Sequence, residues 1–81
     1  MKYIIFDLDD TVLIKGHASD KTLETLKKCQ KKGHKIVINT ARSFPYGKKY
    51  IELFEADYAI LNGGAVIVDK NHDILFEEKN R

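Results

Sequence analysis

Short apolar runs alternate with segments of helical periodicity along this chain, and this alternation restricts its possible folds more than any other feature. The apolar runs cover residues 3–8, 35–39 and 58–61 and are rich in β-branched and aromatic residues, which predicts strands. Because polar residues do not alternate with apolar ones in the first two runs, we expect both strands to be buried on both faces.

Two helices are expected between these strands. The first follows Ser19, a suitable N-cap, and runs to Lys32; Gly33 then supplies the left-handed stop. The second begins near Pro45, which suits a first helical turn, although Gly47 is a poor helix former. Apolar residues recur at helical spacing in the second helix: Tyr46, Tyr50, Ile51, Leu53 and Phe54.

A β-hairpin is expected at the end of the sequence, where residues 65–68 and 74–76 flank a polar turn over 69–73. Strands that alternate with helices pair in parallel through right-handed crossovers, which predicts an α/β fold with a parallel sheet. With 81 residues, the chain is short enough to form a single domain over 1–81.

Composition excludes several classes of protein. The chain has 14 basic and 12 acidic residues, and a net charge of +2 disfavours a nucleic-acid ligand. One cysteine, Cys29, excludes an internal disulfide, and with three histidines it excludes a Cys/His zinc cluster. The apolar stretch before Asp7 is too short for a signal peptide or a membrane span, so we expect a cytoplasmic protein without a membrane partner.

Polar residues follow each of the three strands, at the edge of a parallel sheet where ligands bind in open α/β folds. Those after the first strand are Asp7, Asp9, Asp10 and Thr11. Those after the second strand are Asn39, Thr40 and Arg42. Those after the third strand are Asn62, Gly63 and Gly64.

Carboxylates this close together repel one another unless a cation or a proton is shared between them. Mg²⁺ satisfies this requirement, because it prefers oxygen ligands and binds one or two carboxylates together with a substrate phosphate. The backbone must coil at Leu8 for Asp7 and Asp9 to reach one site, and Thr40 could donate its hydroxyl to a phosphoryl oxygen. The alternative is that Asp9, Asp10 and Thr11 only satisfy backbone groups in a turn.

Three motifs give the sequence a resemblance to a known family. Residues 6–13, Phe-Asp-Leu-Asp-Asp-Thr-Val-Leu, resemble the opening motif of the haloacid dehalogenase (HAD) superfamily, and residues 32–42 resemble its second motif. Residues 60–67, followed by Asp69, resemble the Asn-Gly-Ala stretch of its Cof-type sugar-phosphatase branch. The resemblance implies a truncated core with a Rossmann-like parallel sheet and a C-terminal β-hairpin.

The resemblance also implies a reaction. It is that of a Mg²⁺-dependent phosphatase or phosphotransferase, which hydrolyses a phosphate monoester through an aspartyl-phosphate intermediate; sugar phosphates are among the candidate substrates. Asp7 would be the nucleophile and Asp9 the general acid and then base, and the two would hold the metal. The residues that would bind the substrate phosphate are Leu8, Asp9, Thr40, Ala41 and Arg42.

Some of these roles have alternatives. Ala41 replaces the glycine of the family's Thr-Gly-Arg, and Arg42 fits a structural partner of nearby carboxylates or carbonyls equally well. Asn62 and Gly63 are expected to shape a turn rather than to touch substrate.

Two parts of the family pattern have no match: the lysine of the third motif and the acidic pair of the fourth. Lys48, Lys49 and Lys79 are candidates to replace the lysine. The cap domain of Cof-type relatives is also without a counterpart, and the first strand should then be an exposed sheet edge. We expect this edge to pair with a second copy of the chain, giving a homo-oligomer, or with the remainder of a longer protein. The alternative function is that of a catalytically deficient remnant or fragment, acting as a Mg²⁺/phosphate-binding or protein-interaction module.

Overall fold

The computed structural model describes residues 1–8 and 20–78 of the chain. Its elements, in chain order, are β1 (Tyr3–Asp7), α1 (Asp20–Lys31), β2 (Lys35–Asn39), α2 (Phe44–Phe54), β3 (Tyr58–Leu61), the 3₁₀ turn η2 (Asn62–Gly64), β4 (Val66–Asp69) and β5 (Ile74–Glu77). The expected N-cap Ser19 lies outside the described residues. The three expected strands, the two helices and the hairpin are all confirmed within one or two residues.

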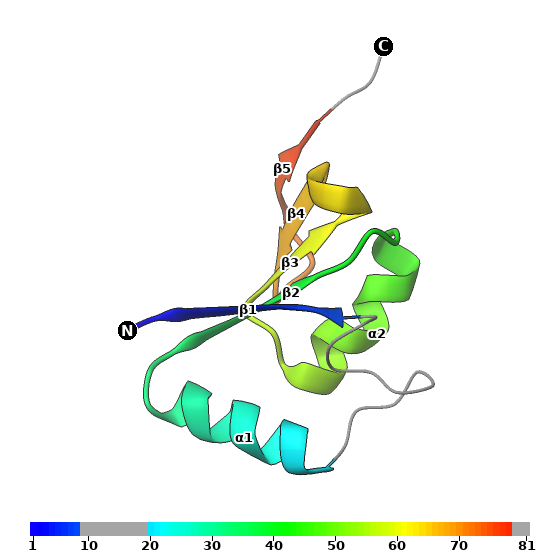
Figure 1. Cartoon of the computed structure of the whole chain (residues 1–81). Helices are drawn as coiled ribbons and strands as arrows, with labels where there is room; N and C mark the ends of the chain where they lie inside the picture. The colour runs from blue at the N-terminus through cyan, green and yellow to red at the C-terminus, as the bar shows by residue number, and fades with distance from the viewer. Residues whose placement is uncertain (9–19, 79–81) are drawn as a thin grey trace.

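All five strands belong to one sheet in the order β1-β2-β3-β4-β5 (Figure 1). The first three strands are parallel to one another, as expected for an α/β fold. The hairpin extends this sheet, because β4 pairs antiparallel with β3, and β5 antiparallel with β4. The sheet is therefore mixed, with a parallel half that carries the strand ends of interest.

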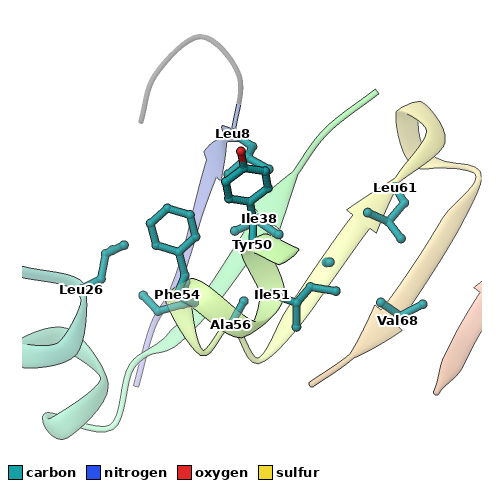
Figure 2. Packing of buried hydrophobic residues seen from close by; sticks show 11 residues of the cluster. Leu8, Leu26, Ile38, Tyr50, Ile51, Phe54, Ala56, Leu61 and Val68 are labelled. Carbon is teal, nitrogen blue, oxygen red and sulfur yellow. The ribbon is translucent and has the colours of Figure 1, made fainter. Parts of the chain in front are cut away.

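Both helices cover the same face of the sheet. This follows from the strand order, since two right-handed crossovers that step in the same direction place both helices on one side. Figure 2 shows Leu26 of α1, with Tyr50 and Phe54 of α2, in the buried cluster formed with the sheet. The sheet contributes mainly Ile36, Ile38, Ala59, Leu61 and Val68 to this core.

The opposite face of the sheet, here called the open face, carries a second set of apolar side chains. Strand register assigns seven residues to it: Tyr3, Ile5, Val37, Tyr58, Ile60, Ile67 and Phe76. The rings of Tyr3 and Tyr58 lie 6.4 Å apart, as expected for neighbours on one face. Within residues 1–8 and 20–78, no helix covers the open face.

The expectation that the first strand is buried on both faces is therefore wrong. In β1, Ile4 and Phe6 point to the helices, whereas Tyr3 and Ile5 are 56% and 59% exposed. The expectation holds for β2, where Ile36, Val37 and Ile38 are all buried because this strand has a neighbour on each side. The expected exposed edge is confirmed, because β1 is the outermost strand of the described sheet.

The helix ends and the hairpin turn follow the sequence signals. Gly33 follows α1 with φ +90°, the left-handed conformation expected of the stop residue. In the hairpin turn, Oδ1 of Asp69 accepts the backbone N–H groups of Asn71 and Asp73, which fixes the turn. No described helix has the length and apolar character needed to cross a membrane.

Gly47 has a packing reason for its place inside α2. A Cβ atom at this position would lie 2.6 Å from Cδ2 of Leu61, so the missing side chain lets α2 approach β3 closely. Leu61 is itself fully buried in the core and has little room to move aside. The close packing of α2 against Leu61 therefore accounts for glycine at this position, although glycine is a poor helix former.

We expect Gly47→Ala to destabilise the protein, although alanine is the better helix former. The gain in propensity is about 1 kcal/mol, whereas overpacking a tight core contact costs about 1–3 kcal/mol. Urea denaturation followed by circular dichroism measures the change in the free energy of unfolding. Leu61→Ala removes the side chain that the new Cβ would meet. Gly47→Ala should therefore lower the free energy of unfolding less in the Leu61→Ala background than in the wild type, and an equal loss in both backgrounds would contradict this explanation.

Candidate functional site

A pocket of about 480 Å³ lies at the carboxyl ends of β1, β2 and β3. Its lining residues are Asp7, Asn39, Thr40, Ala41, Ile60, Gly63 and Gly64. The parallel register brings them together, because Asp7 pairs with Asn39 and Asn39 pairs with Ile60. The predicted convergence of three strand ends on one edge is confirmed for the residues that the structure describes.

Asp7 is the last residue of β1 and its side chain is exposed. Its Oδ1 accepts a hydrogen bond of 3.0 Å from Nδ2 of Asn39 on the neighbouring strand. Among the described residues, Asn39 is the only one that contacts the Asp7 carboxylate through a polar group. The pocket therefore holds a carboxylate with one oxygen bound by a neutral donor.

Thr40 is held firmly at the end of β2. Its backbone N–H donates to the carbonyl of Ile60 at 2.9 Å, and its own carbonyl accepts the N–H of Gly63 at 3.2 Å. Its Oγ1 accepts the backbone N–H of Arg42 at 3.1 Å, and the residue is 4% exposed. Thr40 thus connects the ends of β2 and β3 through its backbone hydrogen bonds, and it also lines the pocket.

The segment after β3 forms a tight turn, as expected from its sequence. Asn62, Gly63 and Gly64 have φ values of +53°, +66° and +104°, which favour asparagine and glycine. The Asn62 N–H donates to the carbonyl of Arg42 at 2.9 Å, so this turn is bound to the loop after β2. Gly63 and Gly64 line the pocket through this turn.

Two predicted site residues, Arg42 and Leu8, do not bring their side chains to the pocket, and others are not described. Arg42 does not line the pocket; its guanidinium lies 4.5 Å from the centre of the Tyr46 ring, which suits a structural role better than phosphate binding. Leu8 is fully buried in the core, so only its backbone remains available to a ligand. Asp9 lies outside the described residues, as do Asp10 and Thr11.

The donor set fits Mg²⁺ in type. Asp7 supplies a hard carboxylate oxygen at the pocket, which is the kind of ligand that Mg²⁺ prefers. Over residues 1–8 and 20–78, no three His, Cys, Asp or Glu side chains are grouped as metal ligands. The second carboxylate that the sequence predicts for the ion, Asp9, lies outside the described residues.

No lysine or arginine of the described chain lines the pocket. Of the candidates for the missing lysine, Lys48 is exposed on α2, and Nζ of Lys49 lies 5.4 Å from the centre of the Tyr50 ring. Lys79 lies outside the described residues. The pocket wall includes four residues that sequence reasoning did not assign to substrate binding: Asn39, Ile60, Gly63 and Gly64. Because neighbouring residues of a strand point to opposite faces, the core-facing Leu61 would have placed Ile60 on the other face of the sheet.

Comparisons with solved structures find the same architecture in larger proteins. A haloacid dehalogenase-like hydrolase from B. subtilis superposes with a TM-score of 0.87 and 29% identity, over 99% of this chain and 29% of that one. A phosphatase of the haloalkanoate enzyme superfamily from Bacteroides thetaiotaomicron gives a TM-score of 0.81 and 27% identity, over 95% of this chain and 29% of that one. The chain thus spans under a third of the length of these relatives.

A subclass IIB sugar phosphatase shares the fold, with a TM-score of 0.77 and 23% identity, over 95% of this chain and 31% of that one. A search of curated proteins finds no match. The profile of one family, described as haloacid dehalogenase-like hydrolase, matches residues 4–80. With nearly every residue covered by that match, and with the fold shared, the chain belongs to the haloacid dehalogenase-like hydrolase family.

Proposed function

We propose that this chain is a Mg²⁺-dependent phosphatase or phosphotransferase that acts on a small phosphate monoester, with sugar phosphates among its candidate substrates. The observation that carries the proposal is the pocket at the ends of β1 to β3, which brings the Asp7 carboxylate and Thr40 together. Family membership and neighbours that are phosphatases support it. The free thiol Cys29 is in keeping with a cytoplasmic enzyme.

The reaction would take place in two balanced steps. In the first, an Asp7 carboxylate oxygen attacks phosphorus, the bond from phosphorus to the ester oxygen breaks, and Asp9 gives its proton to the leaving alcohol. In the second, water attacks the phosphorus of the aspartyl-phosphate while Asp9 accepts a proton. The bond to Asp7 then breaks and inorganic phosphate leaves.

Thr40 would orient the transferring phosphoryl group, because its fixed position at the end of β2 keeps it beside the pocket. Ala41 lines the same pocket, and its backbone N–H would donate to a phosphate oxygen. Mg²⁺, held by Asp7 and Asp9, would offset the negative charge of the two carboxylates and the phosphoryl group.

The test is an assay of the purified 81-residue chain with p-nitrophenyl phosphate, with MgCl₂ or with excess EDTA. We expect slow, Mg²⁺-dependent release of p-nitrophenol, because the Asp7 side chain at the pocket is exposed to water. No release above the buffer rate at any Mg²⁺ concentration would contradict the proposal. Equal release with MgCl₂ and with EDTA would contradict the role of the metal.

A second candidate function is that of a Mg²⁺/phosphate-binding or protein-interaction module without catalysis. The observation in its favour is that no lysine or arginine among residues 1–8 and 20–78 lines the pocket, so this part of the chain offers a phosphoryl group no cation. Isothermal titration with phosphate and MgCl₂, read beside the p-nitrophenyl phosphate assay, distinguishes the two candidates. A module would bind phosphate and leave p-nitrophenyl phosphate intact.

Self-association through the free edge of β1 would accompany either function. The other outer strand, β5, is protected by an irregularity: its ladder with β4 shifts register at Ile67/Val68. The ladder of β1 with β2 has no such irregularity, and Tyr3 and Ile5 of β1 are exposed apolar residues. A second copy could pair with this edge and cover part of that surface.

We expect the wild-type chain to sediment as a dimer and Ile5→Lys to sediment as a monomer, because a charge on an edge strand opposes pairing. Analytical ultracentrifugation measures both. Ile74→Lys is the matched control, since Ile74 on β5 is 60% exposed and Ile5 is 59% exposed. A monomeric wild type, or dissociation caused by Ile74→Lys alone, would exclude the β1 edge as the interface.

A further inference from the structure

The hydrogen bond between Asn39 and Asp7 involves a third polar side chain of the pocket, beside Asp7 and Thr40. We propose that Asn39 is a positioning residue: its amide holds Oδ1 of Asp7 and thereby leaves Oδ2 as the oxygen that attacks the phosphoryl group. This inference rests on the proposed function, because it assigns a role relative to a nucleophile. It adds a residue to which the sequence alone gave no defined role.

The backbone fixes the Asn39 side chain in place. Asp7 and Asn39 are register partners on adjacent parallel strands, so their side chains leave the sheet on the same face. β2 has a neighbour on each side, and the next residue, Thr40, is bound to Ile60 through its N–H. The amide therefore approaches Asp7 from a rigid strand and not from a loop.

The contact also binds only one of the two oxygens of the Asp7 carboxylate. Nδ2 donates to Oδ1 at 3.0 Å, and within the described residues no second donor reaches the carboxylate. A carboxylate with one bound oxygen loses rotational freedom about its terminal bond, so the other oxygen keeps a defined direction. A neutral amide does this without pairing the carboxylate with a full positive charge, which would compete with Mg²⁺.

A simple cross-strand polar pair is the competing explanation. Such a pair at the exposed end of two strands contributes modestly to the stability of the fold and has no effect on the reaction beyond that. The two explanations differ in what Asn39→Ala changes. Loss of positioning lowers kcat while KM and folding stay close to the wild-type values, whereas loss of a structural pair lowers stability alone.

The experiment compares the full 81-residue wild type with Asn39→Ala and Asn39→Gln. The readouts are kcat and KM on p-nitrophenyl phosphate with MgCl₂, the thermal midpoint, and binding of beryllium fluoride with MgCl₂, followed by ¹⁹F NMR as a mimic of the aspartyl-phosphate. Asn71→Ala is the control, because Asn71 is exposed in the hairpin turn and does not line this pocket.

For Asn39→Ala we expect kcat and beryllium fluoride affinity each to fall about tenfold or more, the effect usual for a residue that orients a reacting ligand. KM should stay within about twofold, Asn39→Gln should recover part of kcat, and Asn71→Ala should match the wild type. An active wild type with an equally active Asn39→Ala would overturn the inference and leave the proposed function intact. A wild type that neither turns over ester nor binds beryllium fluoride would contradict the proposed function itself, and the inference with it.

Discussion

Replacing Asp7 with asparagine is expected to lower phosphatase activity by about a thousandfold or more, because the amide is a poor nucleophile and cannot form the aspartyl-phosphate. The fold should survive the change. Asp7 is exposed at the end of an edge strand, and an asparagine there has nearly the same shape. The measurement is kcat/KM with MgCl₂ beside the thermal midpoint of the same sample.

The control for this variant is Asp73→Asn. Asp73 is an exposed carboxylate in the hairpin turn and does not line the pocket, so its neutralisation makes the same change in net charge. Activity should stay within about twofold of the wild type, since exposed surface substitutions have small effects. Asp7→Asn with the activity of Asp73→Asn would show that Asp7 does not carry the reaction.

Phe54→Ala is expected to have the largest effect on stability. Phe54 is 3% exposed, meets the Phe6 ring edge-to-face with centroids 5.7 Å apart, and stacks with Tyr50 at 6.3 Å. Truncating a buried phenylalanine costs about 3–5 kcal/mol, against a total stability of about 5 kcal/mol at the lower end for small domains. Most or all of the net stability should therefore be lost, and circular dichroism in urea measures this.

Leu53→Ala is the matched control for Phe54→Ala. Leu53 precedes Phe54 in α2 but is 43% exposed and outside the buried cluster. Its truncation removes little buried apolar area and should cost less than about 1 kcal/mol. Equal losses for the two variants would show that the face of α2 toward the sheet does not hold the fold together.

Local signals were sufficient to predict the elements of this fold. The pattern over 35–39 depends only on neighbouring residues, as does the left-handed Gly33, and both agree with the structure. The exposure of β1 depends on a nonlocal property. Two crossovers in the same direction put both helices on one face, so Ile5 remains exposed although its local sequence resembles that of a buried strand.

In the candidate site, too, some features could be predicted from the sequence and others depend on nonlocal contacts. The ends of parallel strands meet at one edge by topology, which is why Asp7, Thr40 and Gly63 were predicted together and do line one pocket. Arg42 was assigned a phosphate role by motif position, yet its guanidinium lies over Tyr46, four residues on. The cross-strand bond from Asn39 to Asp7 depends on the register of two strands 32 residues apart, and no local pattern specifies it.

The central claim is that Asp7 is transiently phosphorylated, and acid quenching followed by peptide mass spectrometry tests it most directly. The full chain is mixed with p-nitrophenyl phosphate and MgCl₂, quenched during turnover, and reduced with borohydride to mark acyl phosphates. We predict that the peptide containing Asp7 carries the phosphoryl group before reduction and the reduced side chain after it, and that Asp7→Asn carries neither. Turnover with an unmodified Asp7 peptide, or the label on another residue, would contradict the account.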